Sequence, residues 1–217
     1  MKLLTLFLLI AALASNLYAD PRLWDHRGVA LFQNGRVEWE QSAARDSNGM
    51  TATTWSDMHG GSRDVYAQLV NPAGETLWGD GVQITTESHE QSQPHVVATN
   101  GGWIVSWIDY RNVPPGQTHR EEGGSIWLQK LDYQGNPLWT PGGVCLDSSY
   151  DGRVRWGFLR LVSDNAGGAT TTWATLTSGW MIYADQITAN GTLAWPRITI
   201  TQSGDQSLME TVSDGAG

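Results

Sequence analysis

The 217-residue chain has a single cysteine, Cys145, and few basic side chains, with 13 Lys and Arg against 22 Asp and Glu. One cysteine cannot form an internal disulfide or a cysteine-rich zinc site, so the fold must depend on an apolar core. The formal net charge of −9 argues against nucleic-acid binding, which needs a basic surface to meet phosphate. After the N-terminal region, no window has a sustained helical period or a run apolar enough to span a membrane. We therefore expect an all-β protein with no nucleic-acid partner and no membrane span.

The first residues have the pattern of a secretory signal peptide. Lys2 precedes an apolar run from Leu3 to Ala14, and Leu17-Tyr18-Ala19 follows. We expect a signal peptide over residues 1–19, with cleavage after Ala14 as an alternative. The run is too short for a membrane helix. The sequence therefore predicts an exported protein, either secreted or held at the cell surface.

Two sequence patterns alternate along the rest of the chain with a mean period of about 59 residues. One runs from an aromatic residue through a turn and Gly to Trp, in residues 64–78, 125–139 and 182–195. The other covers residues 43–57, 96–109 and 161–175, and begins again at residues 210–217. Because the two patterns are independent and share one period, we interpret the chain as a repeat protein.

Each copy contains four short extended runs and no helical pattern. Residues 96–99 and 103–108 flank Asn100-Gly101-Gly102, which is hairpin chemistry. Residues 65–70 and 75–78 flank a turn with Gly74 at its fourth place, and Gly135 and Gly191 take that place in the other copies. This spacing predicts a type I turn followed by a left-handed residue. Each unit is therefore predicted to be a four-stranded antiparallel meander, the unit of a β-propeller blade.

Two other β architectures fit the period less well. An immunoglobulin-like sandwich needs about 100 residues per domain, and a β-solenoid, kept as a minor alternative, has shorter rungs. The stretch from Gly74 to Ile84, GETLWGDGVQI, instead resembles the delta-60 type repeat of long-blade propellers in large secreted bacterial proteins. The usual Phe-Gly step of that repeat stands as Trp78-Gly79 here and as Trp-Thr and Trp-Pro in the later copies. The resemblance covers residues 42–217 and is nearly silent on function.

The two alternating patterns predict about three blades, at residues 42–93, 94–158 and 159–206, with irregular N-terminal strands over 20–41 and a truncated unit at 207–217. Closed propellers have about four to eight blades. We therefore expect an incomplete ring and a fragment of a longer protein, whose remainder beyond Gly217 would be a partner of this chain. Proteins with such repeats often end in a cell-surface sorting domain.

The chain contains 12 tryptophans, and seven of them recur at two repeat positions. Such periodic aromatic residues indicate packing between blades rather than ligand binding, and we expect a structural role together with the turn glycines: Trp39, Trp78, Trp139 and Trp195; Trp55, Trp107 and Trp173; Gly74, Gly135 and Gly191. The less regular Trp24, Trp156 and Trp180 are candidates for exposed contacts, since aromatic faces stack on sugars.

Charged candidates gather where strands end. Asp57 and Asp109 each follow a strand at a loop mouth, where propellers commonly bind ligands. They could form a carboxylate ring for Ca²⁺ or for acid–base chemistry, or they could cap turns and pair with Arg63 and Arg111. An insertion over residues 113–124 is either a binding loop or a neutral expansion. The candidate ligand-binding residues are therefore Asp57, Asp109, Arg111, His119, Glu121, Glu122, Trp156 and Trp180.

No catalytic, cofactor or metal motif is present in the sequence. The segment from Glu87 to His95 lacks metal-ligand spacing and is predicted to be a solvated connection. We expect an exported, non-enzymatic propeller segment that serves as a scaffold or recognition module of a larger extracellular protein, with a glycan or a protein as ligand and no cofactor. The alternative is the propeller of a glycan-active hydrolase or lyase. The Asp-box of sialidases lacks its Asp here, since Pro72, Tyr133 and Ala189 occupy that place. A purely structural ring with no ligand is the third possibility.

Overall fold

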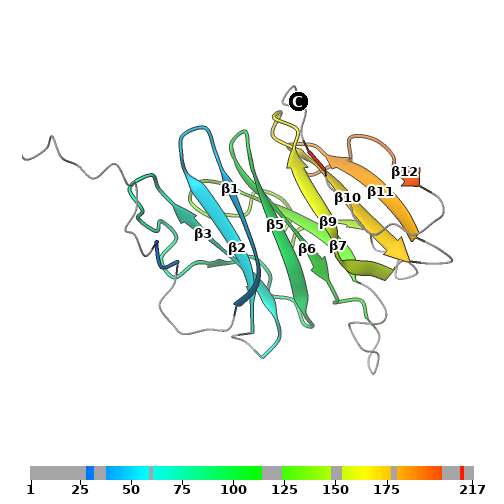
Figure 1. Cartoon of the computed structure of the whole chain (residues 1–217), viewed down its shortest axis with the longest axis horizontal. Helices are drawn as coiled ribbons and strands as arrows, with labels where there is room; N and C mark the ends of the chain where they lie inside the picture. The colour runs from blue at the N-terminus through cyan, green and yellow to red at the C-terminus, as the bar shows by residue number, and fades with distance from the viewer. Residues whose placement is uncertain are drawn as a thin grey trace, which may run out of the picture.

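A computed structural model describes residues 28–31, 38–58, 61–113, 124–147, 153–176, 180–201 and 211–212. Within these residues every regular element is a β-strand (Figure 1). The predicted signal peptide lies outside the described residues, as does Trp24. The all-β class predicted from the sequence is thus confirmed.

The twelve strands form three four-stranded sheets, and each sheet follows the chain order. The first contains β1 (Glu38–Arg45), β2 (Thr51–Asp57), β3 (Asp64–Val70) and β4 (Val82–Gln83). The second contains β5 (Gln91–Thr99), β6 (Gly102–Asp109), β7 (Ser125–Leu131) and β8 (Val144–Asp147). The third contains β9 (Arg153–Ser163), β10 (Ala169–Leu176), β11 (Trp180–Ile187) and β12 (Ile198–Thr201). All neighbouring strands are antiparallel, which confirms the repeated meander.

The sheets are placed in sequence, with their first strands next to one another. β1 contacts β5, and β5 contacts β9 (Figure 1). One apolar core, which includes Leu69 and Trp107, fills the space between the first and second sheets. Another, which includes Leu128 and Trp173, joins the second and third. This arrangement is consistent with propeller-like blades.

A β-bulge lies in each pairing between the first and second strands of a sheet. The register shifts between Trp39 and Ser42 in β1, between Ser92 and His95 in β5, and opposite Trp173 and Thr175 in the third sheet. A bulge inserts a residue and bends the strand without ending it. Each first strand therefore continues past the bulge and begins before the repeat boundaries at 42, 94 and 159.

The bulge also corrects the prediction for residues 87–95. Gln91 to His95 belong to β5 and do not form a solvated connection. The backbone N–H of Gln91 donates to the carbonyl of Arg63 at 2.7 Å, and Gln91 also pairs with Asp109. The polar residues of this segment therefore lie against the first sheet, and Gln91, Ser92 and Gln93 are buried.

The turn with Gly at its fourth place forms as predicted. The N–H of Gly74 donates to the carbonyl of Asn71 at 2.9 Å, and the equivalent bonds of Gly135 and Gly191 measure 3.1 and 3.0 Å. Their φ angles are 85°, 84° and 79°. This left-handed conformation favours glycine because it has no Cβ.

The run after this turn differs from the prediction. Residues 75–78 do not form a regular strand: Val70 and Thr76 make an isolated bridge, and the N–H of Leu77 donates to the carbonyl of Leu69 at 2.8 Å. The fourth strand of the sheet is β4, at Val82–Gln83. The physical reason is the side chain of Gln68, whose Oε1 accepts the backbone N–H of Trp78 at 2.9 Å in place of a neighbouring strand. Gln129 and Trp139 repeat this bond at 3.1 Å in the second sheet.

The tryptophan after the turn reaches the next sheet in the first and second sheets. The indole Nε1 of Trp78 donates to the carbonyl of Tyr133 at 3.1 Å, and that of Trp139 donates to the carbonyl of Ala189 at 3.0 Å. Both acceptors are the second residue of the glycine turn in the following sheet. Three other repeat tryptophans are buried: Trp55, Trp107 and Trp173. Trp195 is half-buried, and the side chain of Trp39 lies outside the described part.

The turn glycine packs directly against this indole. A Cβ on Gly135 would lie 2.9 Å from Cγ2 of Val82 and 3.2 Å from the Trp78 ring, and one on Gly191 would lie 2.9 Å from Cγ of Trp139. Glycine is thus required at this place twice over, by its left-handed φ angle and by the ring of the preceding sheet.

Replacing Gly135 by alanine separates these two requirements. Gly101 has the same φ of 84° with no atom within 4 Å of its would-be Cβ, so Gly101→Ala carries the backbone strain alone. We expect Gly101→Ala to cost about 1–2 kcal/mol and Gly135→Ala to cost about 1–3 kcal/mol more, because the indole must shift. Urea unfolding of both variants measures the difference. Equal losses would show that the indole exerts no packing constraint on the turn.

Candidate functional site

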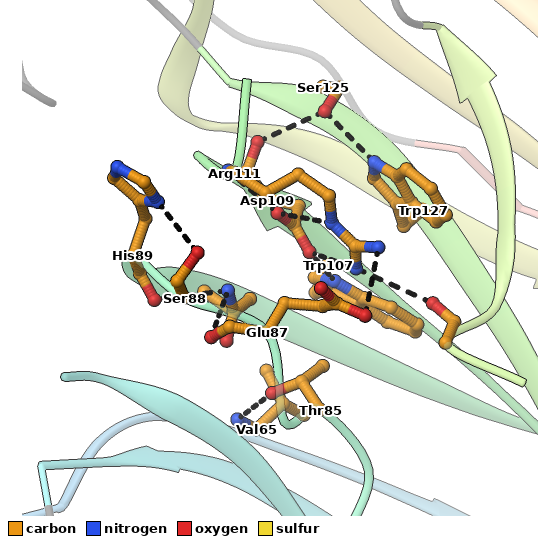
Figure 2. A network of polar contacts seen from close by, with 12 residues as sticks. Val65, Thr85, Glu87, Ser88, His89, Trp107, Asp109, Arg111, Ser125 and Trp127 are labelled. Atoms are coloured by element: carbon orange, nitrogen blue, oxygen red, sulfur yellow. Dashed lines mark hydrogen bonds and ion pairs between the residues drawn. The ribbon is translucent and has the colours of Figure 1, made fainter. Parts of the chain in front are cut away.

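A buried ion pair occupies the end of the second sheet, at the loop mouth between β6 and β7 (Figure 2). Asp109 ends β6, and its side chain is fully buried. Its Oδ1 accepts the backbone N–H and the Nε–H of Arg111, both at 2.9 Å. Its Oδ2 accepts Nη2 of Arg111 at 2.6 Å and the indole Nε1 of Trp107 at 3.0 Å. The carboxylate therefore accepts four hydrogen bonds from its own chain.

The Arg111 guanidinium links this carboxylate to two further segments. It lies 3.7 Å from the ring centroid of Trp127, in cation–π contact. Its Nη1 lies 3.5 Å from Oε1 of Glu87, which precedes β5 and is partly exposed. Trp127 donates to Oγ of Ser125 at 2.9 Å, and that hydroxyl donates to the backbone carbonyl of Asp109 at 3.1 Å (Figure 2). The network thus ties the ends of β6 and β7 to the segment that precedes β5.

The first sheet presents acidic side chains at its matching end. Asp57 ends β2 and pairs in register with Asp64, the first residue of β3, and both are buried. Burial, followed by the nearby charges of Asp57 and Asp109, raises the pKa of Asp64 to about 6. Its Oδ2 accepts Nε2 of Gln83 at 3.2 Å. The pKa of the Asp64 carboxyl thus lies in the range used in acid–base catalysis. Asp64 was not among the candidate residues predicted from the sequence.

The proposed carboxylate ring does not come together as a cation site. Among the residues that the structure describes, no group of three or more His, Cys, Asp or Glu side chains could hold a metal ion. Glu40, next to the bulge in β1, is used in packing: its Oε2 accepts the N–H of Gln93 at 2.7 Å and the hydroxyl of Ser56 at 3.0 Å. The geometry thus supports the interpretation of Asp109 as a structural partner of Arg111.

A second arginine cluster, absent from the sequence-based candidates, joins the second and third sheets. Nη1 of Arg197 lies 3.2 Å from Oδ2 of Asp147, and its Nη2 lies 3.2 Å from Oδ2 of Asp185. The guanidinium lies 4.8 Å from the Trp173 ring centroid. Burial raises the pKa of Asp185, and the charge of Arg197 opposes that shift. Asp147 belongs to β8, so the cluster crosses the boundary between sheets.

The repeat alignment contains a signal for this cluster. Ile198 pairs with Ala184 as Val82 pairs with Ala67, so Arg197 takes the place of Gly81. A Cβ on Gly81 would lie 3.0 Å from the Trp55 ring. The first copy has Gly81 packed against the ring of Trp55, whereas the third copy has Arg197 stacked on the ring of Trp173. In the same copy Asp185 stands where the other copies have glutamine, which supplies the countercharge.

The remaining candidates are not brought together. His119, Glu121 and Glu122 lie outside the described residues. Trp156 belongs to β9, with its side chain outside the described part, and Trp180 begins β11 and is half-buried. Among the predicted binding residues that the structure describes, Asp109 and Arg111 bind each other directly.

Cys145 and His95 are both uncharged at pH 7. Burial, with the nearby charge of Asp147, raises the pKa of the Cys145 thiol to about 11. A protonated thiol is a weak nucleophile. Burial and the charge of Arg160 lower the pKa of His95 to about 4. His95 therefore carries no charge between the sheets under physiological conditions.

The comparisons with known proteins assign no family. No family model matches the chain, and no curated protein sequence is significantly similar to it. In the portion of the chain that is described, no helix has the length and apolar character to cross a membrane.

Asp109 and Glu87 contact the same arginine from a buried and an exposed position, which allows a matched test. Asp109→Asn removes the charge that balances a mostly buried guanidinium, so we expect a loss of about 3–5 kcal/mol of unfolding free energy. Glu87→Gln should cost less than about 1 kcal/mol because solvent already screens that pair. Urea unfolding measures both. A loss from Asp109→Asn as small as that from Glu87→Gln would contradict the structural role of the network.

Proposed function

We propose that the chain is an exported, non-enzymatic β-propeller segment that serves as a scaffold or recognition module of a larger extracellular or cell-surface protein. The observation that carries this proposal is the saturation of Asp109, whose two oxygens accept four hydrogen bonds from Arg111 and Trp107. A catalytic carboxylate must instead reach a substrate proton. The best-formed charged site at the loop mouth is thus occupied by internal structure.

The architecture supports the propeller part of the proposal. Three meander sheets follow one another with adjacent first strands, as blades do in a propeller. The stretch from Gly74 to Ile84 resembles the delta-60 type repeat of secreted bacterial proteins. The apolar N-terminal run supports export. Repeat scaffolds of this kind present their loops as binding surfaces, and a glycan or a protein is the ligand class that suits an extracellular setting.

One observation favours an enzymatic alternative. Asp57 and Asp64 are paired across β2 and β3, and the pKa of Asp64 is raised to about 6. Glycan-active hydrolases use two carboxyl groups with separated pKa values, one as acid and one as base or nucleophile. In a glycan-active hydrolase or lyase, Asp64 would be the proton donor, and Asp57, paired with it across β2 and β3, would be the second carboxyl group.

A combined binding and turnover experiment separates the two functions. The purified chain is applied to a glycan array, and bound or dissolved glycans are assayed for newly formed reducing ends and unsaturated products. We expect no turnover by the native chain and no change in any binding on Asp64→Asn. Turnover that disappears in Asp64→Asn, with a pH profile bending near 6, would overturn the non-enzymatic proposal. Glu87→Gln serves as the control for a nearby carboxylate of no catalytic role.

A further inference from the structure

The outer face of the third sheet exposes apolar side chains whose counterparts in the other sheets are partly buried against an inter-sheet core. Ile198 and Ile200 of β12 share one face of the strand and are 49% and 53% exposed. By register, Ile198 corresponds to Val82 in β4 and to Val144 in β8. Both valines pack against the cores that join one sheet to the next. The third sheet thus presents the same apolar face without a sheet against it among the described residues.

Trp195 lies on this face in an altered arrangement. Trp78 and Trp139 donate to the glycine turn of the following sheet. Trp195 holds the same repeat position, but its Nε1 donates to Oε1 of Gln186 at 2.6 Å, within its own sheet. The ring is half-buried. The third sheet therefore carries the tryptophan of a contact between consecutive sheets that the chain forms twice, through Trp78 and Trp139.

The outer face of the first sheet, at the other end of the row of sheets, is covered. On the outer face of the first sheet, Trp55 and Tyr66 are buried. Nε2 of Gln68 on that face donates to the backbone carbonyl of Leu31 at 3.3 Å. Since this face is already covered, the first sheet of a second copy does not offer a free surface to match Trp195. The outer face of the first sheet is thus covered, whereas that of the third sheet is exposed.

The chain itself approaches the exposed end with the start of another repeat. Oγ1 of Thr211 lies 2.5 Å from Oγ1 of Thr172 in β10, and Val212 follows, 84% exposed. The sequence from Thr211 aligns with residues 161–167, which end β9 and enter its hairpin. Thr211 therefore stands next to the third sheet at the position in the repeat that belongs to a first strand.

We propose that the outer face of the third sheet docks a fourth four-stranded sheet of the same repeat, whose first strand includes Thr211. In this arrangement Ile198 and Ile200 enter a third inter-sheet core. The Trp195 indole leaves Gln186 and donates to the second carbonyl of the incoming glycine turn, as Trp78 and Trp139 do. The partner sheet must present a glycine turn to Trp195 and an apolar face to Ile198 and Ile200. This docking does not depend on whether the protein binds a ligand.

A thiol placed on the exposed face tests this proposal. In a Cys145→Ser background, Ile200→Cys is compared with Ser47→Cys, an exposed site in the turn between β1 and β2. Each is made in the native-length chain and in a chain where residues 168–201 are repeated after Gly217, which completes one more repeat. Reaction with a soluble aromatic disulfide reagent measures exposure, light scattering measures mass, and circular dichroism measures added strand.

We expect the thiol at position 200 to react rapidly in the native-length monomer and at least about tenfold more slowly in the extended chain, because it then reacts only on local opening. The thiol at position 47 should react alike in both. Replacing the second copy of Gly191 by valine should restore fast reaction at position 200, since a side chain there displaces the indole.

Three results would overturn the proposal. One is an unchanged reaction rate at position 200 in an extended chain that gains strand signal. Another is an appended repeat that stays unfolded. The last is protection of position 200 in the native-length chain at twice the monomer mass, which would make a second copy the occupant.

Discussion

The contact between a tryptophan and the glycine turn of the next sheet is the interaction on which the assembly depends. A four-stranded meander buries only one layer of apolar side chains, so each sheet needs a neighbour on its face. Trp78 and Trp139 supply that neighbour with a large apolar ring and one directional hydrogen bond. The glycine beneath the ring admits close approach, as the 2.9 Å contact of a Cβ at Gly191 shows. This contact recurs between the first and second sheets and between the second and third.

Polar contacts between sheets complete the apolar packing and explain why so many charges are internal. Lys130 donates from Nζ to the carbonyls of Asn100 and Gly167, at 3.1 and 2.7 Å, and so joins the hairpin loops of the second and third sheets. Burial lowers the pKa of this lysine. Arg197 joins the same sheets through Asp147 and Asp185. Such clusters fix register between faces that apolar contact alone would allow to slide.

Repeat spacing and turn chemistry were sufficient to predict the sheets. The glycine at the fourth turn position and the period shared by two patterns led directly to three antiparallel meanders. The fourth strand was misplaced because the side chain of Gln68 takes the N–H of Trp78 from a neighbouring strand, which a propensity pattern does not record. The extent of β5 was underestimated for a similar reason, since a bulge carries the strand through Gln93 and Pro94.

The candidate site was less accessible to sequence reasoning, because it depends on which charges meet across sheets. Asp109 and Arg111 are neighbours in sequence, so their pairing was open to prediction. Asp64 acquires its raised pKa from burial and from Asp109 in another sheet. Arg197 was detectable only by noticing that it replaces a glycine of the repeat.

Comparing Trp78→Ala with Trp195→Ala by urea unfolding tests the central claim most directly. The two residues share a repeat position, but only Trp78 contacts a following sheet among the described residues. The account predicts a loss of about 3–5 kcal/mol for Trp78→Ala and a clearly smaller loss for the half-exposed Trp195. An unchanged unfolding midpoint for Trp78→Ala, or equal losses for the two variants, would contradict it.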